Sequence, residues 1–116
     1  MLHHASLEIK VDDVERTISF WEAIGFERID EPEPLAGHVT WLEHGGTQIH
    51  LMHTDAATVP ALGHVAVVPA GFDEAKRRLK DEGFEVEDAR ELWGEDRAFA
   101  IGPGGHRVEL MRAPPP

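Results

Sequence analysis

The chain of 116 residues contains no cysteine, and acidic residues outnumber basic ones two to one. Without cysteine, disulfides, thiolate metal ligands and cysteine nucleophiles are all excluded. Lysine and arginine together number 11 against 22 aspartates and glutamates, so the formal net charge is −11. An acidic chain of this kind repels phosphate backbones and anionic membrane surfaces. We therefore expect neither a nucleic acid nor a membrane as a partner.

Long apolar runs are also missing, since none approaches the roughly 18 residues of a membrane span. The opening residues, Met1 to His4, lack the basic-then-apolar build of a signal peptide. The absence of cysteine suits a reducing compartment, so the expected location is the cytoplasm. The hydrophobic fraction of 41% and the charged fraction of 28% are typical of a globular chain, and the length suits one domain.

Histidine is abundant, with eight residues, and the chain repeats itself. Residues 46–53 match residues 105–112 at an offset of 59, and Gly25-Phe26-Glu27 matches Gly83-Phe84-Glu85 at an offset of 58. His4-Ala5-Ser6-Leu7 resembles His64-Val65-Ala66-Val67 at an offset of 60. Matches in the same order with nearly constant offsets indicate a duplicated module of about 55 residues.

Local patterns predict the same elements in each half. Alternating polarity indicates a strand over 4–11, and an apolar stripe of Val14, Ile18 and Trp21 indicates a helix, capped by Asp12 or Asp13 and ended by Gly25. Trp21 should lie in the core. Further strands are expected over 26–30, 39–43 and 47–52. The second half predicts a strand over 63–68, a helix over 72–82 and strands over 84–87, 97–101 and 106–111.

The resulting fold class is α+β, with two βαβββ modules in tandem. Module 1 spans about 1–53, a linker about 54–62, module 2 about 63–112, and a proline-rich tail 113–116, all within a single domain covering 1–116. Each module is too small to bury a full core alone. We expect the sheets to curve around a central cavity, with one helix per module on the outer face, paired either within one chain or between two chains.

Strand parity places four polar side chains on the cavity side of this fold: His4, His50, His64 and Glu109. They occupy equivalent positions of the two repeats, so a pseudo-two-fold axis relates the pairs. Three imidazoles and a carboxylate form a donor set for one divalent metal, with Ni, Zn, Co, Mn and Fe(II) all suitable. The other histidines, His3, His38, His44, His53 and His106, are expected to be structural or solvated.

The segments that carry this pattern resemble the vicinal oxygen chelate superfamily. They are 4–9, 20–26, 63–67 and 102–110, the last with Gly102 where the family motif has aspartate. The superfamily includes glyoxalase I, fosfomycin-resistance proteins, extradiol dioxygenases, methylmalonyl-CoA epimerase and bleomycin-resistance proteins. The family's metal positions on the first, fifth and eighth strands fall on His4, His64 and Glu109. The fourth-strand position, glutamate in glyoxalase I, is His50 here.

The resemblance implies an enzyme that holds a small substrate through two vicinal oxygens on a divalent metal, and the leading hypothesis is a glyoxalase-like lyase or isomerase. Glu109 would be a ligand and a proton shuttle, and Glu8 is an alternative base. Side chains that share the cavity face are candidate substrate contacts: Ser6, Gln48, Met52 and Arg107.

Two other functions stay open: a metal-dependent enzyme of another kind, either a fosfomycin-type thiol transferase or an Fe(II) dioxygenase, and a drug-binding protein without turnover, like the bleomycin-resistance proteins. In each case the partner is a small molecule. A homodimer is expected, with Trp21, Trp41 and Trp93 as the available apolar anchors.

Overall fold

The computed structural model describes all 116 residues and confirms the predicted α+β fold of two tandem modules. Module 1 contains β1 (His4–Ile9), α1 (Val14–Ile24), β2 (Glu27–Ile29), β3 (Val39–His44) and β4 (Thr47–His53). Module 2 contains β5 (Val65–Val67), α2 (Phe72–Asp81), β6 (Glu85–Ala89), β7 (Arg97–Ile101) and β8 (Arg107–Met111). Short 3-10 turns lie at Val11–Asp13, Glu33–Leu35 and Pro103–Gly105. Neither helix has the length and apolar character needed to cross a membrane.

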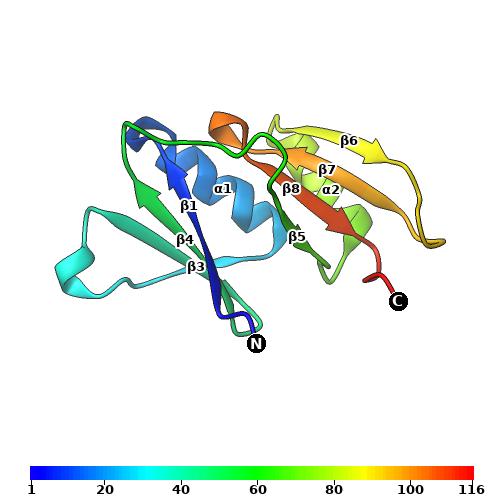
Figure 1. The fold of residues 1–116 in the computed structure, drawn as a ribbon, viewed down its shortest axis with the longest axis horizontal. Coiled ribbons are helices and arrows are strands. Elements are labelled where there is room, and N and C mark those ends of the chain that lie inside the picture. Colours follow the sequence, from blue (N-terminus) through cyan, green and yellow to red (C-terminus); the bar gives the residue numbers. More distant parts are fainter.

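The two sheets have the same topology, as the sequence repeat predicts. Their strand orders are β1-β4-β3-β2 and β5-β8-β7-β6, and in each the first pair is parallel and the others are antiparallel. Figure 1 shows the two modules side by side along the longest dimension of the molecule, which measures 45 × 27 × 25 Å. The duplication of sequence is therefore a duplication of sheet topology.

The main core joins the helix sides of both modules. Trp21 of α1 is 1% exposed, which confirms its predicted place in the core, and Leu79 of α2 is fully buried. Phe20 and Phe84 meet edge to face across the two modules, with ring centroids 5.1 Å apart. The helices α1 and α2 pack against each other, and each covers one face of its own sheet. The other face of each sheet has no helix. We call these the open faces.

The start of α1 differs from the prediction in two details. The first strand ends at Ile9, and Val11, predicted to continue its apolar face, begins a 3-10 turn and is 54% exposed. Asp13 precedes α1 with a helical backbone and no side-chain cap hydrogen bond. The reason is the turn itself, which enters the helix without the extended residue that a capping side chain needs. Gly25 ends α1 with φ 120°, as predicted.

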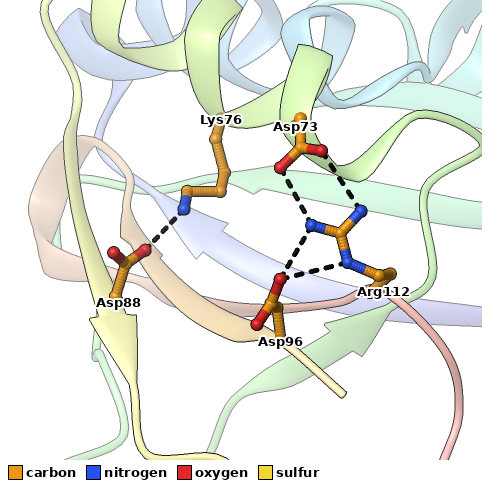
Figure 2. A network of polar contacts seen from close by, with 5 residues as sticks. All are labelled: Asp73, Lys76, Asp88, Asp96 and Arg112. Carbon is orange, nitrogen blue, oxygen red and sulfur yellow. Dashed lines mark hydrogen bonds and ion pairs between the residues drawn. The ribbon is translucent and has the colours of Figure 1, made fainter.

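A polar network ties α2 to the strands and loop beside it (Figure 2). Arg112, just after β8, donates hydrogen bonds to Asp73 of α2 and to Asp96 before β7. Lys76 of α2 pairs with Asp88 of β6 at 2.5 Å. Hydrogen bonds from Arg112 and Lys76 hold the pKa of Asp73 and Asp88 below the usual range. The network therefore joins the end of the chain to the outer side of module 2.

Candidate metal centre

Glu109 and His64 lie together on the open face of module 2. His64 Nε2 is 3.2 Å from Glu109 Oε1, and the Glu109 carboxylate is largely buried, with 10% of its side chain exposed. Two donors about 2.1 Å from one metal ion, at right or tetrahedral angles, are themselves about 3.0–3.4 Å apart. The spacing of these two atoms therefore fits neighbouring ligands of one ion.

The hydrogen bonding of His64 makes this spacing chemically specific. Its Nδ1 lies 2.9 Å from the carbonyl oxygen of Leu62, which can only accept, so Nδ1 carries a proton. In the neutral imidazole Nε2 is then a lone pair, and it faces the carboxylate oxygen of Glu109, another acceptor. The contact needs a positive charge between the two atoms, supplied either by a second ring proton or by a cation bound to both.

Arg97 holds the second oxygen of the same carboxylate. Its Nε donates to Glu109 Oε2 at 2.8 Å, and only 11% of the Arg97 side chain is exposed. Burial alone would raise the pKa of Glu109, but hydrogen bonds from Arg97 and His64 outweigh it and hold that pKa below the ordinary value. Glu109 is therefore an anion at neutral pH, with Oε1 directed toward His64.

On the open face of module 1, three rings form a stack. The His50 ring lies between those of His4 and Trp41. Its centroid is 3.9 Å from that of His4, with 16° between the ring planes, and 4.2 Å from that of Trp41, with 4° between the planes. An imidazole lone pair lies in the plane of its ring, and two nearly parallel planes this far apart do not meet at a shared ligand position. His4 and His50, as placed, cannot both bind one ion.

The tautomer of His50 is fixed by a relay of hydrogen bonds. The amide Nε2 of Gln48 donates to the carboxylate of Glu43 at 3.2 Å, which turns the amide oxygen of Gln48 toward His50 Nε2, 2.7 Å away. His50 Nε2 therefore donates its proton to Gln48. Burial, followed by the charges of His4 and His3, lowers the pKa of His50, so the ring stays neutral. The predicted role of His50 as a fourth ligand requires the ring to leave this arrangement.

The sheet register supports the predicted symmetry of the two pairs. His50 lies opposite Ser6, two residues after His4, and Glu109 lies opposite Ala66, two residues after His64. Next along the sheet come Trp41 beside His50 and Phe99 beside Glu109. Each module thus presents a first-strand histidine, a second donor and an aromatic ring at equivalent places.

The chain does not bring all four predicted ligands together. No group of three or more histidine, aspartate or glutamate side chains is arranged to hold a metal ion within the single chain. The structure instead forms two pairs, His64 with Glu109 and His4 with His50, one on each open face. A site with more than two of these donors needs the open faces of modules 1 and 2 to meet.

The remaining predicted site residues lie on the same two faces, at different distances from the two pairs. Arg107 places its guanidinium carbon 4.3 Å over the Phe99 ring and forms no ion pair. Ser6 and Gln48 flank the ring stack by register, and Met52, 40% exposed, lies beside Glu8. Glu8 accepts a hydrogen bond from the Thr58 backbone in the linker. Glu8 is four residues after His4 on the same strand, so the two Cα atoms lie about 13 Å apart.

Several side chains have roles that sequence patterns did not reveal. His106 is 8% exposed, and its Nε2 donates to the Glu8 carbonyl at 2.8 Å, which joins the two modules. His3, just before β1, lies with its Nδ1 2.9 Å from His4 Nδ1. The sequence gives no sign that Arg97 contacts Glu109, except that Arg97 lies on the same face of β7 as Phe99. Trp41 belongs to the ring stack, and Trp93 donates to the Ala113 carbonyl.

Comparisons with known proteins identify the family to which the chain belongs. The family model described as Glyoxalase/Bleomycin resistance protein/Dioxygenase superfamily matches residues 2–110. The chain belongs to this superfamily. No curated protein matches the sequence. The fold resembles that of a glyoxalase family protein from Bacillus anthracis, at 28% identity and a TM-score of 0.84, covering 96% of this chain and 93% of that one.

Two other members of the superfamily share the fold alone. The fosfomycin resistance protein FosX from Mesorhizobium loti is 16% identical with a TM-score of 0.74, covering 98% of this chain and 92% of that one. The bleomycin resistance determinant of transposon Tn5 is 17% identical with a TM-score of 0.66, covering 92% of this chain and 94% of that one. Since these relatives carry different functions, the shared fold does not choose a reaction, and the choice depends on the site residues.

Proposed function

We propose that this protein is a divalent-metal-dependent, glyoxalase-like enzyme of the lyase or isomerase type that holds a small substrate through two vicinal oxygens. The observation that carries the proposal is the spacing of His64 Nε2 and Glu109 Oε1, which lie 3.2 Å apart while His64 Nδ1 bonds to the Leu62 carbonyl. Their spacing and their need for a positive charge both suit one bound cation. The superfamily supports the same reading, because its members typically use a divalent metal.

The ligands would be His64 and Glu109 from module 2 and His4 from module 1. His4 is exposed and has no hydrogen bond to its Nε2, whereas His50 donates through that atom. Because modules 1 and 2 of one chain join through their helices, a second copy supplies the facing module. The protein would thus act as a homodimer with sites shared between chains.

When bound, the metal would polarise the substrate oxygens and stabilise the negative charge that develops on them. The chain's own residues set the rest of the site. Arg107, with a guanidinium free of ion pairs beside Phe99, would bind an anionic group of the substrate. Arg97 keeps the Glu109 carboxylate ionised and in place, so Glu109 serves as a ligand and not as a mobile base. Glu8 can act as the base only on a substrate that extends along β1.

The decisive experiment is metal analysis by mass spectrometry of untagged protein purified without chelators. About one divalent metal per chain is expected in the wild type, and His64→Ala should lose it. His38→Ala is the matched control, since that histidine is exposed and lies outside both pairs. Protein that contains no metal and takes up no Ni, Zn, Mn or Fe(II) would contradict the proposal.

The donor set itself favours a second candidate reaction. Two histidines and one carboxylate with open positions are the ligands of non-haem Fe(II) oxygenases. Bound iron together with oxygen consumption in the presence of catechols would favour a dioxygenase. A redox-inert metal such as Zn, with turnover of hemithioacetals, would favour the lyase. The metal identified in the first experiment therefore decides which substrates are tested.

A further inference from the structure

Arg97 contacts the candidate metal centre on one side and a neighbouring loop on the other. It is the first residue of β7, and its Nε donates to Glu109 Oε2 at 2.8 Å. Its Nη1 donates to the carbonyl oxygen of Arg90 at 2.5 Å, and its guanidinium lies 5.4 Å from the centre of the Trp93 ring. Arg90 and Trp93 both belong to the loop between β6 and β7.

These contacts determine how the carboxylate of Glu109 can bind. An unrestrained carboxylate can turn and offer a metal both oxygens, which would occupy two coordination positions. In this chain Oε2 already accepts from Arg97, so Oε1 alone faces His64. The burial of both partners, with 11% and 10% of the side chains exposed, limits water as a substitute donor.

We propose that Arg97 is a positioning residue: it holds Glu109 as a single-oxygen metal ligand and links the 90–96 loop to the metal centre. This inference rests on the proposed function, because it concerns the same cation. The planar guanidinium makes it possible, since Nε and Nη1 point in different directions and reach the carboxylate and the loop at once. Single-oxygen binding by Glu109 would leave an adjacent position open for the second substrate oxygen.

The alternative is that the Arg97–Glu109 pair only stabilises the fold. Metal binding separates the two interpretations, because groups that orient ligands typically change metal affinity about 10- to 100-fold when mutated. The probe is Co(II) alone, titrated into the full chain from which metal has been removed and followed by calorimetry and by the visible absorption of the bound ion. Neither readout depends on an enzymatic substrate.

Three variants make the test specific. Arg97→Gln is expected to bind Co(II) about 10- to 100-fold more weakly and to alter the visible spectrum. Arg97→Lys should recover part of the affinity, because an ammonium group can reach Glu109 but cannot hold Arg90 in the same planar geometry. Arg78→Gln is the matched control, since it breaks an arginine–glutamate ion pair within α2, outside the metal centre and the 90–96 loop, and should stay within about twofold of wild type.

The outcomes separate this inference from the proposed function. If the wild type binds no Co(II), the proposed function fails, and the inference fails with it. If the wild type binds Co(II) but Arg97→Gln has the same affinity and spectrum, the inference alone is overturned. Should Arg97→Gln not fold by circular dichroism, Arg97→Lys decides, and unchanged affinity and spectrum in that variant overturn the inference.

Discussion

At the scale of single residues, the hydrogen-bonding partner of each histidine decides what that histidine can do. His64 and His50 belong to different pairs and come from non-equivalent strands, and their Nε2 atoms differ. With Nδ1 donating to the Leu62 carbonyl, the neutral His64 ring has its lone pair at Nε2, whereas His50 Nε2 donates its hydrogen bond to the Gln48 amide oxygen. A ligand position must present a lone pair, so the two modules contribute unequally to a metal site.

This difference predicts the result of replacing His50. We expect His50→Gln to retain most of the bound metal, with affinity within a few-fold of wild type, while His4→Gln loses metal as completely as His64→Ala. The stacked His50 ring is not free to share an ion with His4. Metal content of the purified variants provides the measurement. Loss of metal in His50→Gln equal to that in His64→Ala would restore the four-ligand set that strand parity predicted.

Arg107 leads to a second prediction at this scale, about the charge of the substrate. In metal-loaded protein, Arg107→Gln should weaken binding of oxalate, a chelating dianion, by about 10- to 100-fold, since a hydrogen bond to a charged group contributes about 1.5–3 kcal/mol. Binding of acetohydroxamic acid, a chelator of lower charge, should change much less. Isothermal titration of both compounds tests this, and equal losses for the two would argue against an anion-binding role.

The sequence predicted which side chains share a face, but not which atoms they present. Alternation along a strand has a period of two, so it placed His4, His50, His64 and Glu109 on the open faces. Their protonation and orientation depend on hydrogen-bonding partners that no sequence pattern marks, such as Leu62, Gln48 and Arg97. No local pattern encodes these contacts, so the ring stack and the Arg97 contact appear only in the structure.

At the scale of elements, the internal repeat was a stronger guide to the helices and strands than polarity alternation alone. Two copies of one pattern confirm each other, so the helices and the strands were predicted to within about two residues. The exception at Val11 has a local cause, because alternation continued past the point where a 3-10 turn leaves the sheet. Polarity alone does not mark that point. The polar network beside α2 was also not predicted, since its members lie far apart in sequence.

That network predicts how stability depends on pH. The pKa of Asp73 is lowered in the folded state, so its contribution to stability is present above the ordinary aspartate value of about 3.9 and is lost as pH falls through the lowered value. Arg112→Gln removes this contribution (Figure 2). At pH 7 we expect a lower urea midpoint in the variant, with a difference from wild type that shrinks below pH 4.

The salt dependence provides a check on the same prediction. Asp73, Asp96 and Arg112 are exposed to solvent, so about 1 M salt should screen their attraction and shrink the difference at pH 7 as well. A difference that persists unchanged at low pH and at high salt would instead indicate a packing role for Arg112, whose guanidinium also lies 4.8 Å from the centre of the Phe72 ring.

At the scale of the whole molecule, the core explains why one chain forms only halves of a site. Both helices pack into a shared core, so the helix sides of the modules face each other and the open faces do not. Strand parity cannot predict this, because it relates side chains to their own sheet and carries no information on how two sheets are placed. The sequence therefore left pairing within a chain and pairing between chains equally open.

Mixing two inactive variants distinguishes these arrangements. If each site combines module 1 of one chain with module 2 of its partner, a heterodimer of His4→Ala and His64→Ala contains one site with neither mutation and one with both. Unfolding and refolding an equal mixture should then restore about a quarter of the wild-type metal content, because about half of the dimers are mixed and each has one intact site. Each variant refolded alone should bind almost none. If the modules pair within a chain, every site in the mixture carries a mutation, and metal content stays at the level of the single variants.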